Sequence, residues 1–189
     1  VILVATQPDL GTSILIAAGG IVVAWLAGVR AKFFVISGFT MLALLPIAIS
    51  FLKPYQKSRI LTFLNPERDP LGAGYQIIQS KIAIGSGGLF GKGFLNGSQS
   101  YLDYLPEKHT DFIFTLFSEE FGFFGSLFIL LLYALIISRI VKIGNMTRSN
   151  FGKLYCYSFA TAFFIYVVVN MMMVLGLLPI VGSPLPIMS

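Results

Sequence analysis

Long uncharged apolar runs constrain the fold of this chain more than any other feature. Residues 10–29, 33–52 and 154–178 contain no charged side chain, and in residues 112–137 the run is interrupted only by two acidic residues. Each run is close to the roughly 20 residues that a helix needs to cross the hydrocarbon layer. The pattern therefore predicts an all-α polytopic membrane protein with about four transmembrane helices.

The composition excludes several other classes of protein. Charged residues make up 11% of the chain, against roughly 25% in a soluble domain. The net charge of +5 is diffuse, and without a basic stripe or zinc-finger spacing it gives no indication of a nucleic-acid partner. A single cysteine, Cys156, allows no internal disulfide. Because the chain starts without methionine, we expect a fragment of a larger polytopic protein.

The short connections between the apolar runs predict the orientation in the membrane. They carry basic residues and no acidic ones, and basic short loops stay in the cytoplasm. The longer segment of residues 53–110 is then expected to be an extracytoplasmic loop with short interfacial helices. The basic residues of the short connections are Arg30, Lys32, Arg139, Lys142, Arg148 and Lys153.

Two stretches of the long loop have recognisable patterns. Residues 75–84 place apolar side chains at helical spacing, which predicts a helix with one apolar face. The glycine-rich residues 85–93 resemble a phosphate-binding loop, but Ser86 and Gly93 stand where that motif needs glycine and a hydroxyl residue. We therefore interpret them as a turn whose backbone approaches neighbouring helices or lipid.

A cluster of charged residues ends the long loop, directly before the third apolar run. Polar groups at a hydrocarbon boundary are functional candidates, although a solvated loop tip with a helix cap is the alternative. Asp111 is placed to take a proton from a hydroxyl group on a lipid-anchored substrate. We assign substrate-binding roles to the other members of the cluster, Asp103, Glu107, Lys108 and His109.

Cations and acids elsewhere suggest further roles. Arg59 and Lys81 lie among apolar residues and are candidates for binding lipid phosphates. Lys92 has the pattern of an ordinary surface lysine. Glu119 and Glu120 are deep in the third run, where a structural ion pair or a protonated carboxyl group is favoured over catalysis.

The histidine cannot make a zinc site alone, so no protein metal centre is predicted. The alternative is a divalent cation, Mg²⁺ or Mn²⁺, held by oxygens of Asp103, Glu107 or Asp111 and shared with a substrate pyrophosphate.

Beyond these patterns, several ordered motifs closely resemble the SEDS family (shape, elongation, division and sporulation proteins), and within it the rod-shape, RodA type. The motifs are residues 7–12 (QPDLGT), 55–59 (YQKSR), 65–89, 105–114 (LPEKHTDFIF), 119–122 (EEFG) and 176–186 (GLLPIVGSPLP). They cover almost the whole chain, which would be the C-terminal half of a ten-span domain.

The resemblance implies an inverting peptidoglycan glycosyltransferase that polymerises lipid II at the outer face of the bacterial cytoplasmic membrane. It also implies a class B penicillin-binding protein and the elongation machinery as partners, besides membrane lipids. In the family motif the catalytic aspartate corresponds to Asp111. A flippase for lipid-linked precursors and a non-catalytic scaffold for a transpeptidase are the alternatives.

Overall fold

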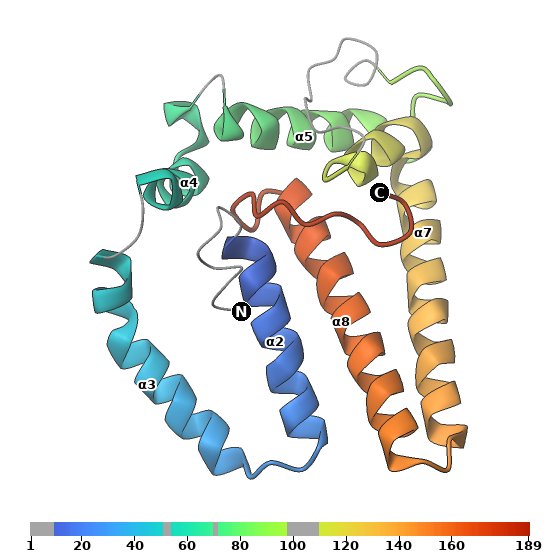
Figure 1. Cartoon of the computed structure of the whole chain (residues 1–189). Coiled ribbons are helices and arrows are strands. Elements are labelled where there is room, and N and C mark those ends of the chain that lie inside the picture. Colours follow the sequence, from blue (N-terminus) through green and yellow to red (C-terminus); the bar gives the residue numbers. More distant parts are fainter. Residues whose placement is uncertain (1–9, 51–53, 70–71, 98–109) are drawn as a thin grey trace.

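The computed structural model describes residues 10–50, 54–69, 72–97 and 110–189, and these residues form helices joined by turns, with no strand among them (Figure 1). The elements in chain order are α2 (Leu10–Leu26), α3 (Ala31–Ser50), α4 (Pro54–Leu64), the 3-10 helix η1 (Pro66–Arg68), α5 (Ala73–Gly87), α7 (Ile113–Met146) and α8 (Asn150–Val174).

The four predicted apolar runs and the helix of the long loop all correspond to helices. The largest difference is at the end of α7, which continues to Met146 instead of ending near residue 137. The residues after 137 include Arg139 and Lys142, and long basic side chains are good helix formers that can reach back to water from the end of an apolar helix. Helix α8 ends at Val174, where Leu175 and then Gly176, with a φ of 67°, close the last turn.

The apolar helices leave most of their hydrophobic side chains exposed, as in a membrane protein. Helices α7 and α8 are long and apolar enough to cross a membrane, and shorter apolar helices lie within α2 and α3. Only 11% of the apolar window of α7 and 33% of that of α8 are buried. A core helix of a soluble protein would bury most of such a window, so these side chains are suited to hydrocarbon.

Both basic connections lie at the same end of the molecule. The turn between α2 and α3 and the turn between α7 and α8 are at the bottom of Figure 1, while α4, α5 and the final residues of the chain are at the top. This arrangement agrees with the prediction that both short basic connections lie on the same side. Helix α8 packs between α2 and α7, and α5 crosses the end of α7.

The hydrophobic core lies where the two longest helices meet the last residues of the chain. We call residues 175–189 the C-terminal segment; it contains three prolines, which disfavour a helix, and it forms none. The buried members of this core are Phe112, Phe114, Tyr133, Val167, Met173, Val174 and Leu185. Tyr133 also donates a 2.6 Å hydrogen bond to the backbone oxygen of Pro186, which fixes the end of the segment to α7.

Candidate functional site

The C-terminal segment organises the end of the molecule that holds the candidate site. From the end of α8 it passes the top of α2 and returns to α7 (Figure 1). Gly11 allows the close contact with α2, since a Cβ atom there would lie 2.4 Å from the backbone oxygen of Val181. The backbone of the segment is therefore held against the helix ends.

Asp111 lies beside this segment, in the turn that precedes α7. Its side chain is partly buried, and a Cβ atom at Gly182 would lie 3.6 Å from its Oδ2. The N-cap residue of α7 is Phe112, not Asp111, and it makes no side-chain capping hydrogen bond.

Asn170 fixes the backbone on both sides of this contact. Its Nδ2 donates hydrogen bonds of 2.8 Å to the backbone oxygen of Asp111 and 2.7 Å to that of Ser183. The Asn170 side chain is fully buried. Sequence reasoning missed this residue, although an amide inside an otherwise apolar run was a usable signal, because buried polar groups in membrane helices need partners.

Arg59 and Lys81 reach the same segment from two other helices. Arg59, on α4, donates from Nη1 to the backbone oxygen of Ile180 at 3.3 Å. Lys81, on α5, lies against Gly176, where a Cβ atom would lie 2.3 Å from its Cε and 2.7 Å from its Nζ. Both side chains remain exposed, so their remaining N–H groups are accessible to an anion.

Three predicted site residues are therefore brought to one short stretch, residues 176–182, although they come from α4, α5 and the turn before α7. A carboxylate and two cations along one stretch of backbone can accept a proton and bind anionic oxygens.

The four remaining predicted residues, Asp103, Glu107, Lys108 and His109, lie outside the described residues. Among residues 10–50, 54–69, 72–97 and 110–189, no three His, Cys, Asp or Glu side chains cluster as a metal site. The predicted divalent cation stays a prediction, to which Asp111 would contribute one oxygen ligand.

A buried hydroxyl pair holds α5 over the two long helices. Ser80 Oγ donates to the backbone oxygen of Val174 at 2.7 Å and lies 2.8 Å from Thr115 Oγ1. Because the single Ser80 proton goes to Val174, Thr115 is the donor of the second bond. This contact sets the height of Lys81, the next residue on α5.

Helix α7 is interrupted at Gly122, whose φ of 67° and ψ of −161° are not helical. In a continuous helix, the amides of Phe123 and Phe124 would donate to the oxygens of Glu119 and Glu120. They donate instead to Gly88 and Leu89, at 2.9 and 3.2 Å.

The backbone oxygens of Glu119 and Glu120, which lose their helical donors at the break, accept hydrogen bonds from the same loop. Glu119 and Glu120 accept from the amides of Lys92 and Gly93, each at 3.0 Å. Residues 88–93 thus exchange hydrogen bonds with the broken helix and leave none of these four amides unpaired. The prediction that the glycine-rich turn closely approaches a helix is confirmed.

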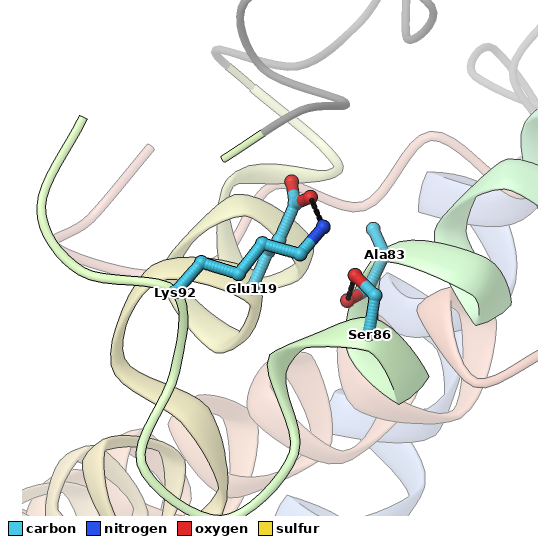
Figure 2. A network of polar contacts seen from close by, with 4 residues as sticks. All are labelled: Ala83, Ser86, Lys92 and Glu119. Carbon is cyan, nitrogen blue, oxygen red and sulfur yellow. Dashed lines mark hydrogen bonds and ion pairs between the residues drawn. The ribbon is translucent and has the colours of Figure 1, made fainter. Parts of the chain in front are cut away.

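A side-chain ion pair reinforces this exchange. Lys92 Nζ lies 2.6 Å from Glu119 Oε1, and the Glu119 side chain is fully buried while that of Lys92 is 29% exposed (Figure 2). The structural ion pair predicted for the acidic pair is confirmed at Glu119. The interpretation of Lys92 as an ordinary surface lysine is wrong, because its partner is 27 positions away and belongs to a different element.

The comparisons with known proteins agree with this architecture. The family model of FtsW, RodA and SpoVE, described as "Cell cycle protein", matches residues 1–189, and the chain belongs to this family. It is 50% identical to the peptidoglycan glycosyltransferase MrdB of Escherichia coli K12 over 100% of this chain and 51% of that protein. It is 46% identical to the peptidoglycan glycosyltransferase RodA of Treponema pallidum over 76% of this chain and 33% of that protein.

A solved structure is also similar. One chain of a peptidoglycan synthase complex matches 99% of this chain with a TM-score of 0.77 and 36% identity, over 51% of its own length. The present chain therefore spans about half the length of the relatives with which it aligns throughout.

Proposed function

We propose that this chain is the C-terminal half of a SEDS peptidoglycan glycosyltransferase that polymerises lipid II during cell elongation. The observation that supports the proposal best is that Asp111, Arg59 and Lys81 each lie against residues 176–182 of the C-terminal segment. The names of the relatives, which are peptidoglycan glycosyltransferases of the MrdB and RodA type, support the same activity.

In the proposed reaction Asp111 is the general base. It takes the proton from the 4-hydroxyl group of the acceptor N-acetylglucosamine, and that oxygen attacks the anomeric carbon of the donor chain. The bond from this carbon to undecaprenyl pyrophosphate breaks with inversion. Arg59 and Lys81 would stabilise the negative charge that develops on the departing pyrophosphate. A divalent cation would add charge neutralisation there, with Asp111 and substrate oxygens among its ligands.

The proposal also assigns the reaction to one side of the membrane. The end of the bundle that holds α4, α5 and the C-terminal segment would face outward from the bacterial cytoplasmic membrane, opposite the two basic connections. A class B penicillin-binding protein and the elongation machinery would be the protein partners. The similarity to a peptidoglycan synthase complex is consistent with a transpeptidase partner.

The proposal is tested by replacing the base in the full-length protein. Asp111→Asn and Asp111→Ala should abolish glycan polymerisation from purified lipid II in detergent, while Glu67→Gln, an exposed acid on η1, should leave it unchanged. Full polymerase activity in both Asp111 variants would overturn the assignment of the base. Partner binding and thermal stability are measured alongside, because loss of polymer with both preserved excludes a pure scaffold.

A second candidate function, transport of a lipid-linked precursor, is favoured by one observation. Discontinuous membrane helices occur at transporter substrate sites, and α7 is broken at Gly122. Reconstituted vesicles containing lipid II decide between the two functions: translocation without polymer would support transport, and polymer that disappears in Asp111→Asn would support the transferase.

A further inference from the structure

The ion pair between Lys92 and Glu119 is not used in the proposed reaction, yet it lies on the element that carries the proposed base. Glu119 belongs to the part of α7 before the break, which follows directly on Asp111. At about 3.6 residues per helical turn, the buried carboxylate lies roughly two turns along the helix from the start of that part. A contact that holds Glu119 in place therefore also constrains the position and the rotation of the turn that contains Asp111.

The break at Gly122 removes the usual support for this part of the helix. The amides of Phe123 and Phe124 do not bond back across the break but bond to residues 88 and 89. The orientation of the first part relative to the membrane-spanning part is thus set by residues 88–93 and not by continuous helical hydrogen bonding. Gly91 makes the close crossing possible, since a Cβ atom there would lie 2.0 Å from the backbone oxygen of Glu120.

Within this crossing, backbone bonds define the approach of the two segments, and the ion pair adds a specific side-chain contact. A buried ion pair usually adds little net stability compared with apolar residues of similar size, but it can specify register. The pair has the burial and the short distance that such a role needs, as the orientation of Lys92 over Glu119 in Figure 2 shows. Ser86, nearby on α5, bonds only to the backbone oxygen of Ala83 in its own helix among the contacts drawn there.

We infer that Lys92 and Glu119 are a positioning pair: their contact holds the first part of α7 in the register that presents Asp111 to the acceptor sugar. This inference rests on the proposed function, because it assigns the pair a role in the step for which Asp111 is the base. Neither residue is a catalytic residue, since neither is placed at the reacting atoms.

The test uses the full-length protein in complex with its transpeptidase partner and purified lipid II as the probe. Glu119→Gln keeps the shape of the side chain and removes its charge, and Lys92→Met keeps the aliphatic stem. Lys92→Arg retains the cation. Glu120→Gln is the matched control on the neighbouring acid, and thermal stability is recorded for every variant.

We expect Glu119→Gln and Lys92→Met each to lower kcat by about tenfold or more with KM changed less than about threefold, since small displacements of a reacting group cost large factors in rate. Lys92→Arg should recover most of kcat, and Glu120→Gln should resemble the unmodified protein. A kcat within about twofold of the unmodified value in both charge-removing variants would overturn the inference, as would a loss that disappears after correction for the folded fraction.

A second readout does not depend on the activity. Spin labels at Asp111→Cys and Leu177→Cys, with native cysteines replaced, report the distance from the proposed base to the C-terminal segment. Glu119→Gln should broaden or shift this distance distribution, and Glu120→Gln should not. An unchanged distribution would overturn the positioning of the turn by the pair, whatever Asp111 does. Full activity of Asp111→Asn would instead overturn the proposed base and the role of the pair in that step, while a changed distribution in Glu119→Gln would still show that the pair positions the turn.

Discussion

The carboxamide of Asn170 donates to the backbone oxygen of Asp111 at 2.8 Å, and so ties the turn before α7 to the membrane-embedded part of α8. The same nitrogen also bonds to Ser183 in the C-terminal segment. One buried side chain thus connects the proposed base to the backbone beside it. The position of Asp111 depends on a residue 59 places further along the chain.

We predict that Asn170→Leu will weaken both the fold and the activity. The substitution leaves two carbonyl groups without their donor, and each buried unpaired group costs about 1–3 kcal/mol. The melting temperature of the full-length protein in detergent should fall, and polymerisation should fall further than the folded fraction does. Thr161→Val, which removes a local hydroxyl bond on the same helix, is the control; equal effects of the two variants would contradict this prediction.

Removing the two cations near the C-terminal segment should slow the reaction without unfolding the protein. Arg59→Met and Lys81→Met are each expected to reduce kcat by about 10²-fold, the order found when one donor to a developing negative charge is lost. Lys57→Met, an exposed lysine on the same helix as Arg59, should have little effect. Comparable rates for all three variants in the lipid II assay would show that the cations do not contact the leaving group.

The break in α7 should tolerate no side chain at its centre. The φ of 67° and ψ of −161° at Gly122 lie in a region that is open essentially to glycine alone, and a forced residue costs about 1–3 kcal/mol before any overlap is counted. A Cβ atom would also lie 2.3 Å from the backbone nitrogen of Gly91. Gly122→Ala should therefore sharply reduce the yield of folded protein and its melting temperature.

Gly85→Ala provides the control for that change. Gly85 lies in α5, and a Cβ atom added there would have nothing within 4 Å of it, while alanine favours a helix by about 1 kcal/mol over glycine. The control should be neutral or stabilising in the same thermal measurement. A Gly122→Ala protein as stable as the Gly85→Ala protein would show that the helix is not broken there.

The buried hydroxyl group of Ser80 should contribute more to the stability of the fold than the hydroxyl group of Ser86, which bonds only within the same helix. Ser80→Ala removes the bonds to Thr115 and Val174 and is expected to cost about 1–3 kcal/mol, because both partners lose a buried contact. Ser86→Ala removes only the bond to the backbone oxygen of Ala83 and should cost far less. Thermal unfolding of both variants, compared in one detergent, measures the difference.

Much of the helical architecture was predictable because it follows from local composition. Long apolar runs correspond to α2, α3, α7 and α8, and apolar spacing in the long loop corresponds to α5. Asp111, Arg59 and Lys81 were selected as candidates from charges beside apolar sequence and from the family motifs. Their separate contacts with residues 176–182 could not be predicted, since the prolines of the C-terminal segment indicate only that no helix forms there.

Three features depended on contacts that the local sequence does not contain. Residues 113–146 resemble one continuous helix, and only the hydrogen bonds of residues 88–93 explain the break at Gly122. Lys92 has the pattern of a surface lysine until its partner Glu119 is known. Asn170 is a single amide in an apolar run, and its partners lie in the turn before α7 and in the C-terminal segment.

The exchanged hydrogen bonds at Gly122 have a mechanical consequence. An uninterrupted helix would transmit every change in bilayer thickness or helix tilt to the end near Asp111. A helix that is broken at Gly122 transmits only the movement that the contacts at the break allow. Since residues 88–93 hold the two parts of α7 together at this break, we expect the end of the protein that carries the candidate site to be insulated from the lipid environment by a loop that itself lies outside α7.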